Sequence, residues 1–319
     1  MVEGKTLAVV VPAHDEELLI GRTLETMPEF VDRIYVVDDV SGDATGDRVR
    51  EVAARDPRVV LITHETNGGV GRAIVTGYKA ALADGMEMAA VMAGDAQMDP
   101  DELEHFVLPV ARGEADYTKA NRLITGEAFK EIPKVRYFGN AILSLMTKVA
   151  SGYWHVADSQ AGYTVITAQA LSTMDLDDLY PRYGFPNDML VRLNVDSRTV
   201  QDLPSKPIYG VGERSGIRLY KVVPTIGFLL FRRFWWRMWA RYVVRDFHPL
   251  VFFYAMGTLI TTIGLALGLY GSIRRIGGHE LTIPTVVLIS LLVISGFQFL
   301  LFAMWFDMDY NRGRDNPRR

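Results

Sequence analysis

Two long stretches without a charged residue constrain the fold of this chain more than any other feature of its sequence. Residues 249–271 and 283–306 contain no Asp, Glu, Lys or Arg. As a helix rising about 1.5 Å per residue, each stretch would be roughly 35 Å long, enough to cross a hydrocarbon core of about 30 Å. The pattern predicts two transmembrane helices. The alternative is a helical hairpin buried within a soluble domain.

Arginines are distributed unevenly around these stretches. The short loop between them holds only Arg274 and Arg275. Because the cytoplasmic flanks of transmembrane helices are enriched in Lys and Arg, this bias predicts a multi-pass protein of the cell membrane with both termini in the cytoplasm. No signal peptide is visible at the N-terminus. The flanking arginines are Arg232, Arg233, Arg237, Arg241 and Arg245 before the first stretch and Arg312, Arg314, Arg318 and Arg319 after the second.

The segment that precedes the first uncharged stretch is rich in aromatic residues and arginines. Its spacing is compatible with a basic amphipathic helix in the headgroup layer, with Trp235, Trp236 and Trp239 as interfacial anchors. The alternative is a helix packed beneath the N-terminal domain. Either arrangement would bring that domain to the bilayer surface.

The N-terminal part alternates short apolar runs with residues at helical spacing. This alternation predicts an α/β domain in which helices flank a mostly parallel sheet. With no Cys in the chain, disulfides and thiolate chemistry are excluded. The expected strands are residues 7–11, 34–37, 59–63 and 88–92.

The expected organisation has three parts. Residues 1–225 form a cytoplasmic domain and residues 226–248 a juxtamembrane amphipathic helix. Residues 249–319 contain the two transmembrane helices and a cytoplasmic tail.

Polar loops follow the expected strands, and the carboxyl ends of parallel strands meet at one edge of a sheet. In the fourth loop, Asp95 and Gln97 lie two positions apart, so their oxygens can face the same crevice. A carboxylate, an amide and the oxygens of a diphosphate are suitable ligands for Mg²⁺ or Mn²⁺. The alternative is an acidic turn that caps the following helix, because Asp99 and Pro100 form a typical helix start.

Two common phosphate-binding motifs are absent. PAHDEE stands after the first expected strand, where a dinucleotide-binding fold has a glycine-rich turn, and no GxxxxGK[ST] loop occurs. Gly68, Gly69 and Gly71 follow the third strand, but such a cluster is more often a tight turn than a phosphate cradle. The carboxylates therefore carry the functional argument.

Four ordered blocks resemble those of the inverting family-two glycosyltransferases. They are PAHDE at 12–16, DDVSGDAT at 38–45, NGGVGRA at 67–73 and AGDAQMDP at 93–100. The resemblance implies an A-type glycosyltransferase fold, which is Rossmann-like. This chain departs from the family pattern at Ala93, where the first Asp of an Asp-x-Asp pair is usual, and at Asp15, where Asn is usual.

The resemblance also implies roles for individual residues. Asp95 and Gln97 are expected to hold Mg²⁺ or Mn²⁺, with Asp95 contributing to catalysis. In that family the first two blocks hold the nucleobase and the ribose. The residues expected to bind the nucleotide are Pro12, His14, Glu16, Asp38, Asp39, Gly71, Arg72 and Asp95.

The middle of the chain resembles a narrower branch, the enzymes that glycosylate polyprenyl phosphates. The matching pieces are NR at 121–122, RYFGN at 136–140, DSQAGY at 158–163 and GERSGIR at 212–218, whereas Thr164 stands where that branch often has Arg. Arginines form forked hydrogen bonds with phosphate oxygens. The residues expected to bind the acceptor phosphate are Arg122, Arg136, Asn140, Ser215 and Arg218.

Catalytic contributions are expected from Arg122, Arg136 and Asp158 besides Asp95. Asp158 is open to three interpretations: a base, a group that positions others, or a cap for the turn before Gly162. A phosphate with a second pKa of about 6 needs no base near neutral pH. Lys119 and Lys134 add positive charge to the same region of the sequence.

The expected function is transfer of a hexose, with inversion, from a nucleotide diphosphate sugar to a polyprenyl or dolichyl phosphate. A UDP-sugar is favoured and GDP-mannose is the alternative donor. The expected partners are the donor, the lipid and the membrane, without nucleic acid; self-association is left open. The rival interpretations are transfer to diacylglycerol or ceramide and a non-catalytic nucleotide-sugar-binding scaffold. A processive polysaccharide synthase is disfavoured because no QxxRW block occurs.

Overall fold

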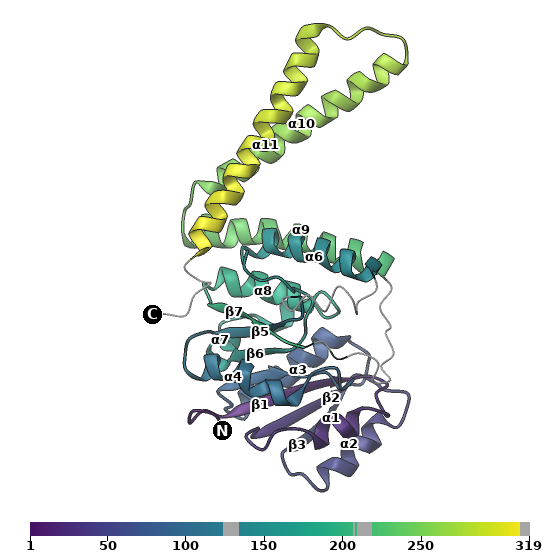
Figure 1. Cartoon of the computed structure of the whole chain (residues 1–319), viewed down its shortest axis with the longest axis vertical. Helices are drawn as coiled ribbons and strands as arrows, with labels where there is room; N and C mark the ends of the chain where they lie inside the picture. Colours follow the sequence, from purple (N-terminus) through teal and green to yellow (C-terminus); the bar gives the residue numbers. More distant parts are fainter. Residues whose placement is uncertain (124–133, 207, 209–218, 313–319) are drawn as a thin grey trace. The chain divides into compact units, whose positions relative to one another are not determined.

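A computed structural model of the chain describes residues 1–123, 134–206, 208 and 219–312. Its N-terminal part is built on a seven-stranded sheet with the strand order β3-β2-β1-β4-β6-β5-β7 (Figure 1). All neighbouring strands are parallel except that β6 runs antiparallel to both β4 and β5. The strands are β1 (Leu7–Ala13), β2 (Arg33–Asp38), β3 (Val59–Thr63), β4 (Met88–Val91), β5 (Tyr117–Asn121), β6 (Thr164–Thr167) and β7 (Val200–Pro204).

Helices cover both faces of this sheet. All seven residues of β1 are buried, as expected for a central strand covered on both sides. Its alternate residues enter different cores: Val9 packs in the core on one face of the sheet, and Val10 packs in the core on the other face. The predicted mostly parallel α/β sheet is confirmed. The helices are α1 (Ile20–Glu25), α2 (Thr45–Ala53), α3 (Val70–Ala83), α4 (Leu103–Ala111), α6 (Lys134–Ser151), α7 (Ala168–Ser172) and α8 (Phe185–Val195), with short 3-10 turns at η1 (Pro100–Glu102) and η2 (Leu176–Asp178).

The reversed strand β6 decides which segments meet at the carboxyl edge of the sheet. Since β6 is antiparallel to β4 and β5, it starts at the edge of the sheet where β1, β2, β4 and β5 end. The residues just before β6 therefore lie at this edge. The Tyr163 hydroxyl donates a hydrogen bond of 2.9 Å to the main-chain oxygen of Asp99 in the loop after β4. Residues separated by more than sixty positions therefore lie together at this edge.

Helix α9 (Leu219–Trp239) packs against the N-terminal domain through one face. Arg233 forms an ion pair of 2.6 Å with Asp188, which is fully buried on α8. On the opposite face, Phe228 and Phe231 are 65% and 60% exposed. The helix is therefore docked on the domain, as one of the two expected arrangements predicts, and its opposite face presents large apolar side chains.

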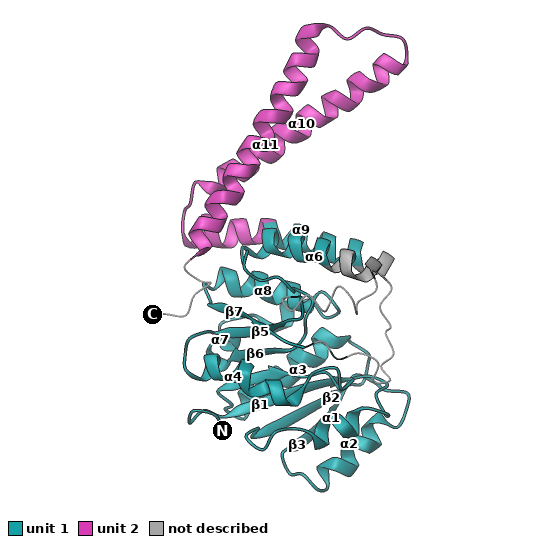
Figure 2. Ribbon diagram, viewed as in Figure 1, with its two compact units in different colours: residues 1–234, 314–319 teal, residues 235–313 magenta. Residues whose placement is uncertain are grey.

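The chain divides into two compact units whose boundary falls within α9, between Phe234 and Trp235 (Figure 2). The second unit contains η3 (Ala240–Arg245), a π-helical segment, followed by α10 (Leu250–Ile276) and α11 (Ile283–Asn311). Helices α10 and α11 are long and apolar enough to cross a membrane.

The pairing of α10 with α11 depends on small residues. A Cβ atom on Gly257 would lie 2.9 Å from the Leu300 side chain, and one on Gly296 would lie 2.3 Å from Thr261 Oγ1. Close approach at such positions is typical of helix pairs in membranes. The outward-facing residues of both helices are mostly large, apolar and exposed, which is the pattern that a lipid environment would cover.

A buried charge pair ties η3 and α9 to the end of α11 within the second unit. Arg237 donates to both carboxylate oxygens of Asp307, at 3.0 and 2.7 Å, and neither side chain is exposed. Tyr242 donates to the same carboxylate at 2.6 Å, and Asn311 does so at 3.0 Å. The carboxylate of Asp307 is therefore the centre of the polar cluster in this unit.

Replacing Asp307 with Asn should destabilise the protein strongly. The buried Arg237 would keep its charge without a countercharge, a change that typically costs about 3–5 kcal/mol. The unfolding temperature of the full-length protein in detergent should fall in Asp307→Asn and stay unchanged in Asp309→Asn, whose side chain is exposed. Equal unfolding temperatures for the two variants would contradict the importance of this pair.

Candidate active site

The loops that follow β1 and β2 are hydrogen-bonded to each other. The amide of Asp15 donates to Ser41 Oγ at 3.0 Å, and the amide of Gly42 donates to Asp15 Oδ1 at 2.7 Å. The amide of Glu16 donates to Thr45 Oγ1 at 2.8 Å. Asp15 uses a carboxylate oxygen only as an acceptor, and an Asn side chain offers the same acceptor. The departure from the family pattern at this position therefore preserves the contact.

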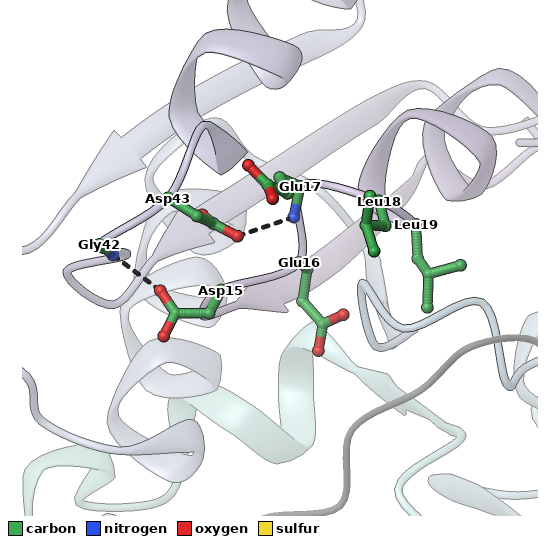
Figure 3. Close-up of a pocket in the computed structure, with 7 residues that line it drawn as sticks. All are labelled: Asp15, Glu16, Glu17, Leu18, Leu19, Gly42 and Asp43. Carbon is green, nitrogen blue, oxygen red and sulfur yellow. Dashed lines mark hydrogen bonds between the residues drawn. The ribbon is translucent and has the colours of Figure 1, made fainter.

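These two loops enclose a hollow of about 330 Å³ with an acidic lining (Figure 3). The Asp43 carboxylate accepts a hydrogen bond from the amide of Glu17 at 3.1 Å, whereas the Glu16 carboxylate extends away from this pair. The lining residues are Asp15, Glu16, Glu17, Leu18, Leu19, Gly42 and Asp43.

Glu16 experiences the negative charge of several loops at once. Its partial burial and the carboxylates of Asp95, Asp43 and Asp15 raise the pKa of Glu16 to about 7, against a smaller opposing effect of His14. The amide of Gly94 donates to the Pro12 carbonyl at 3.3 Å, so the loops after β1 and β4 begin side by side. The predicted site residues Glu16 and Asp95 follow these two points in the chain.

Asp39 is buried and fixes the glycine turn that follows β3. Its carboxylate accepts hydrogen bonds from the amides of Gly68 and Gly69 at 2.8 and 2.7 Å and contacts His64 Nδ1 at 2.8 Å. Burial alone would raise the pKa of Asp39, but these hydrogen bonds outweigh burial and hold the pKa below its usual range. Sequence reasoning missed His64, whose Nε2 lies 2.9 Å from Thr76 Oγ1.

The other residues expected from the first two blocks have mainly local contacts. The Asp38 carboxylate accepts hydrogen bonds from the amide and hydroxyl of Ser41 at 2.9 and 2.6 Å. Pro12 is buried at the end of β1, and its carbonyl accepts a hydrogen bond from Gly94 at 3.3 Å. The His14 side chain is about half exposed. Pro12 and Asp38 therefore shape the edge around Glu16.

Gly71 and Arg72 lie against a loop that sequence reasoning did not connect with the site. A Cβ atom on Gly71 would lie 2.4 Å from the Tyr180 carbonyl oxygen, so only glycine fits there without a shift. The amide of Arg72 donates to the Pro181 carbonyl at 3.1 Å, and its side chain is exposed. No local signal links Tyr180 or Pro181 with the glycine turn, because more than a hundred residues separate them.

Asp95 and Gln97, the residues predicted to hold a cation, could do so only together with oxygens from a bound ligand. Asp95 Oδ1 accepts a hydrogen bond from the amide of Gln97 at 3.1 Å, and both side chains are half-buried. Within the described ranges, no three His, Cys, Asp or Glu side chains converge as a complete metal-binding set. The oxygens of Asp95 and Gln97 are suitable ligands for a divalent cation, but they are too few to hold one by themselves. The chemistry therefore suits a divalent ion that also takes ligand oxygens from a bound diphosphate.

The expected helix cap is also present. Asp99 Oδ1 accepts a hydrogen bond from the amide of Asp101 at 3.0 Å at the start of η1. This cap uses Asp99 and not Asp95, so the expected helix start is confirmed and the cation site at Asp95 and Gln97 stays a prediction.

Arg122 and Asp158 form a forked ion pair at the carboxyl end of β5. Arg122 Nε and Nη2 donate to the two carboxylate oxygens of Asp158 at 2.7 and 3.2 Å. The Asp158 side chain is 2% exposed and that of Arg122 is 24% exposed. Burial alone would raise the pKa of Asp158, but the charges of Arg122 and Lys119 outweigh burial and hold the pKa below its usual range. Asp158 is therefore a poor proton acceptor and a good anchor for Arg122.

Lys119 is expected from the sequence to add positive charge near the bound phosphates. Its side chain is fully buried and so cannot reach a bound diphosphate. Thr164 is also buried, on β6 directly opposite Lys119. Asp188 is held within the domain by Arg233 and lies on α8.

Four residues expected at the acceptor phosphate lie outside what the structure describes in detail. Arg136 and Asn140 belong to α6, but their side chains are outside the described part of the chain. Ser215 and Arg218 lie outside the described residues altogether. Lys134 belongs to α6, and its side chain, like that of Arg136, is outside the described part of the chain.

The sheet order, with β6 reversed and acidic loops at the carboxyl edge, places the chain among the glycosyltransferases of A-type fold. The family described as Glycosyl transferase family 2 matches residues 8–182, more than half of the chain. The chain therefore belongs to glycosyltransferase family 2.

Several proteins named as glycosyltransferases are similar in sequence to this chain. A UDP-N-acetylglucosamine–dolichyl-phosphate N-acetylglucosaminyltransferase of Methanococcus voltae is 29% identical over 72% of this chain and 94% of its own length. An undecaprenyl-phosphate mannosyltransferase of Micrococcus luteus is 29% identical over 61% of this chain and 80% of its own length. A low-salt glycan biosynthesis hexosyltransferase of Haloferax volcanii is 27% identical over 98% of this chain and 71% of its own length.

Solved structures of glucosyl-3-phosphoglycerate synthase from Mycobacterium tuberculosis share the fold. The complex with UDP has a TM-score of 0.53 at 18% identity and covers 73% of this chain and 80% of that protein. The complex with Mn²⁺, UDP and glucosyl-3-phosphoglycerate has a TM-score of 0.52 at 17% identity, with the same coverage. At this identity the likeness supports the fold alone.

The unfavourable surroundings of Glu16 should make stability depend on pH. Because the folded-state pKa of about 7 exceeds the ordinary value of 4.5, the folded state binds the proton more tightly, and stability should fall as pH rises between these values. Glu16→Gln should therefore raise the unfolding temperature most near pH 8 and little near pH 4.5. The unfolding temperatures are measured with a chelator present, so that no metal ion binds near Glu16.

The matched control for this measurement is Glu17→Gln. Glu17 is exposed and its carboxylate accepts a hydrogen bond from the amide of Ala44, which the Gln side chain can also accept. A pH-independent effect of Glu16→Gln would contradict the charge repulsion assigned to Glu16.

Proposed function

We propose that this protein is a membrane-anchored inverting hexosyltransferase. It transfers a hexose from a nucleotide diphosphate sugar to a polyprenyl or dolichyl phosphate, with a UDP-sugar favoured and GDP-mannose as the alternative donor. The relatives named for dolichyl-phosphate and undecaprenyl-phosphate transfer support this acceptor class. The observation that carries the proposal is the meeting of the acidic donor loops and the Arg122–Asp158 pair at one edge of the sheet.

The donor is assigned to the loops after β1, β2, β3 and β4. Asp39 and the glycine turn that it fixes receive the nucleoside, and Glu16 lies beside the ribose and diphosphate. The hydrogen bonds between the loops after β1 and β2 preorganise this half of the site, so little ordering remains when the donor binds.

The diphosphate end of the donor is assigned to Asp95 and Gln97. Mg²⁺ or Mn²⁺ held there together with diphosphate oxygens would supply positive charge next to the leaving group. The chain itself contributes Asp95, the amide side chain of Gln97 and the nearby carboxylate of Glu16. Binding of the donor and the ion would then relieve the repulsion between Glu16 and Asp95.

The acceptor phosphate is assigned to Arg122, together with Arg136, Asn140, Ser215 and Arg218. Asp158 engages Arg122 through two hydrogen bonds and fixes the direction of its guanidinium. A hydroxyl acceptor would need a base, and the low pKa of Asp158 makes this residue unsuitable. A phosphate acceptor is already ionised near neutral pH, so the engagement of Asp158 favours a phosphate over a hydroxyl.

Transfer then proceeds by a single displacement. An oxygen of the lipid phosphate forms a bond with the anomeric carbon while the bond from that carbon to the diphosphate breaks. The nucleoside diphosphate leaves with the electron pair, and the configuration at the anomeric carbon inverts. No proton has to move at the acceptor, so the chain mainly positions both reactants and balances their charge.

The two long apolar helices and the distribution of arginines support the membrane assignment. Residues 1–225 act as the cytoplasmic domain, residues 226–248 lie at the membrane surface, and residues 249–319 carry the two spans, with both termini in the cytoplasm. The lengths and apolarity of α10 and α11 support the spans. A polyprenyl phosphate keeps its phosphate at headgroup level, where a domain attached through α9 can reach it.

Asp95→Ala should abolish transfer. Membranes that contain the wild-type protein, given labelled donor and polyprenyl phosphate, should form a labelled glycolipid, and the variant should lose activity by on the order of 100-fold or more. Asp101→Ala is the matched control, since Asp101 is exposed on the same loop. Unchanged turnover in Asp95→Ala would remove the role of this residue, and labelling of diacylglycerol or ceramide instead would replace the acceptor.

Asp158→Asn separates positioning from base catalysis. Asn keeps the volume but offers Arg122 a weaker, uncharged partner, so the KM for the polyprenyl phosphate should rise by about tenfold while kcat changes little. The dependence of kcat on pH should keep its shape. A large fall in kcat with loss of the acidic limb of the pH profile would show that Asp158 is a base after all.

A further inference from the structure

Lys119 is a buried cation at the acceptor end of the sheet that the proposed mechanism does not use. It lies on β5, paired with Thr164 of β6, and its side chain is completely buried. Its ammonium donates hydrogen bonds to the main-chain oxygens of Asp158 and Ala161 at 2.5 and 3.0 Å. The cation therefore binds the chain itself rather than a ligand.

A charged group at this position is unfavourable by itself. Burial lowers the pKa of Lys119 to about 8; Asp158 and Asp202 oppose this shift, and Arg122 adds to it. A methionine would fill a similar volume without this penalty, but it would leave two buried carbonyl groups without these donors. The contacts made by the ammonium thus account for its presence.

The two carbonyls that Lys119 binds belong to the segment that controls Arg122. Asp158 contributes its carbonyl to Lys119 and its carboxylate to Arg122. At the start of the same segment, the amide of Ala157 donates to Asp202 Oδ2 at 2.9 Å. Residues 157–161 are therefore held to β5 and β7 at several points, and Lys119 supplies two of them.

We propose that Lys119 is a positioning residue for the acceptor site. By fixing the main chain at Asp158 and Ala161, it holds the Asp158 carboxylate where it orients Arg122 toward an anionic acceptor. This inference rests on the proposed function, because it takes Arg122 as a ligand of the acceptor phosphate. The donor loops after β1 and β2 have their own hydrogen bonds and do not depend on Lys119.

The test compares three variants of the full-length protein in lipid nanodiscs. Lys119→Met removes the ammonium, and Lys119→Gln keeps two N–H donors without the charge. Lys79→Met is the matched control, because Lys79 is an exposed lysine that pairs with Asp177.

The expected result is a change in the acceptor KM alone. Lys119→Met should raise the KM for polyprenyl phosphate about tenfold and leave the KM for the donor within about twofold. The acceptor KM of Lys119→Gln should lie between those of Lys119→Met and the wild type. The acceptor KM of Lys79→Met should equal that of the wild type. A folded Lys119→Met with an unchanged acceptor KM, or with equal losses for donor and acceptor, would overturn the proposal.

Hydrogen exchange provides a readout that needs no acceptor. In Lys119→Met, or in Lys119→Gln if the Met variant does not fold, amides of residues 157–161 should exchange faster, while those of residues 34–38 stay unchanged. Equal protection of residues 157–161 in variant and wild type would contradict the proposal. If the wild type transfers no sugar to polyprenyl phosphate, the proposed function fails, and hydrogen exchange alone then decides whether Lys119 fixes this segment.

Discussion

The antiparallel pairing of β6 with β4 and β5 is the constraint on which the rest of the site depends. A parallel strand in this place would enter the sheet at the opposite edge, and the segment that carries Asp158 would lie far from the end of β5. The reversed strand instead brings Asp158 beside Arg122 and allows Tyr163 to bond the loop after β4. The expected donor and acceptor residues share one edge because of a single strand direction.

Buried ion pairs recur where segments distant in sequence are joined. Arg122 meets Asp158 at the carboxyl end of β5, and Arg233 meets Asp188 where α9 packs on α8. Within the second unit, Arg237 meets Asp307. Such pairs add little net stability compared with apolar contacts, but separating the partners is costly. Their effect here is to fix which segments meet, and so to fix the position of the site residues.

The loops at the acidic edge of the sheet are held in place by hydrogen bonds, but the Glu16 carboxylate that they carry has unfavourable electrostatic surroundings. Hydrogen bonds hold the loops after β1 and β2 together, whereas burial and the charges of Asp95, Asp43 and Asp15 raise the pKa of Glu16. In the proposed function, a cation that binds together with the donor would offset this negative charge. With Ala93 in place of a second carboxylate, the donor would have to supply part of the oxygen ligands of that cation.

Much of the fold and part of the site could be predicted from sequence. Apolar runs of strand length and helical spacing fixed the first four strands and their helices, because burial and periodicity are local properties of the chain. The four blocks predict a site at Asp39, Glu16, Asp95 and the glycine turn, and the two uncharged stretches correspond to α10 and α11. The neighbours Tyr180 and Pro181 of the glycine turn could not be predicted, since nothing in their local sequence reports a contact so far along the chain.

The sequence by itself determined the family of the protein, the edge of the sheet at which the polar loops lie and the two long apolar helices. Only the tertiary structure decided what each charged side chain faces. Lys119 and Arg122, three positions apart on the chain, differ completely: one is buried among carbonyl groups and the other is partly exposed beside Asp158. The physical reason is that burial and charge compensation depend on strand order and direction, which residues distant in sequence establish together.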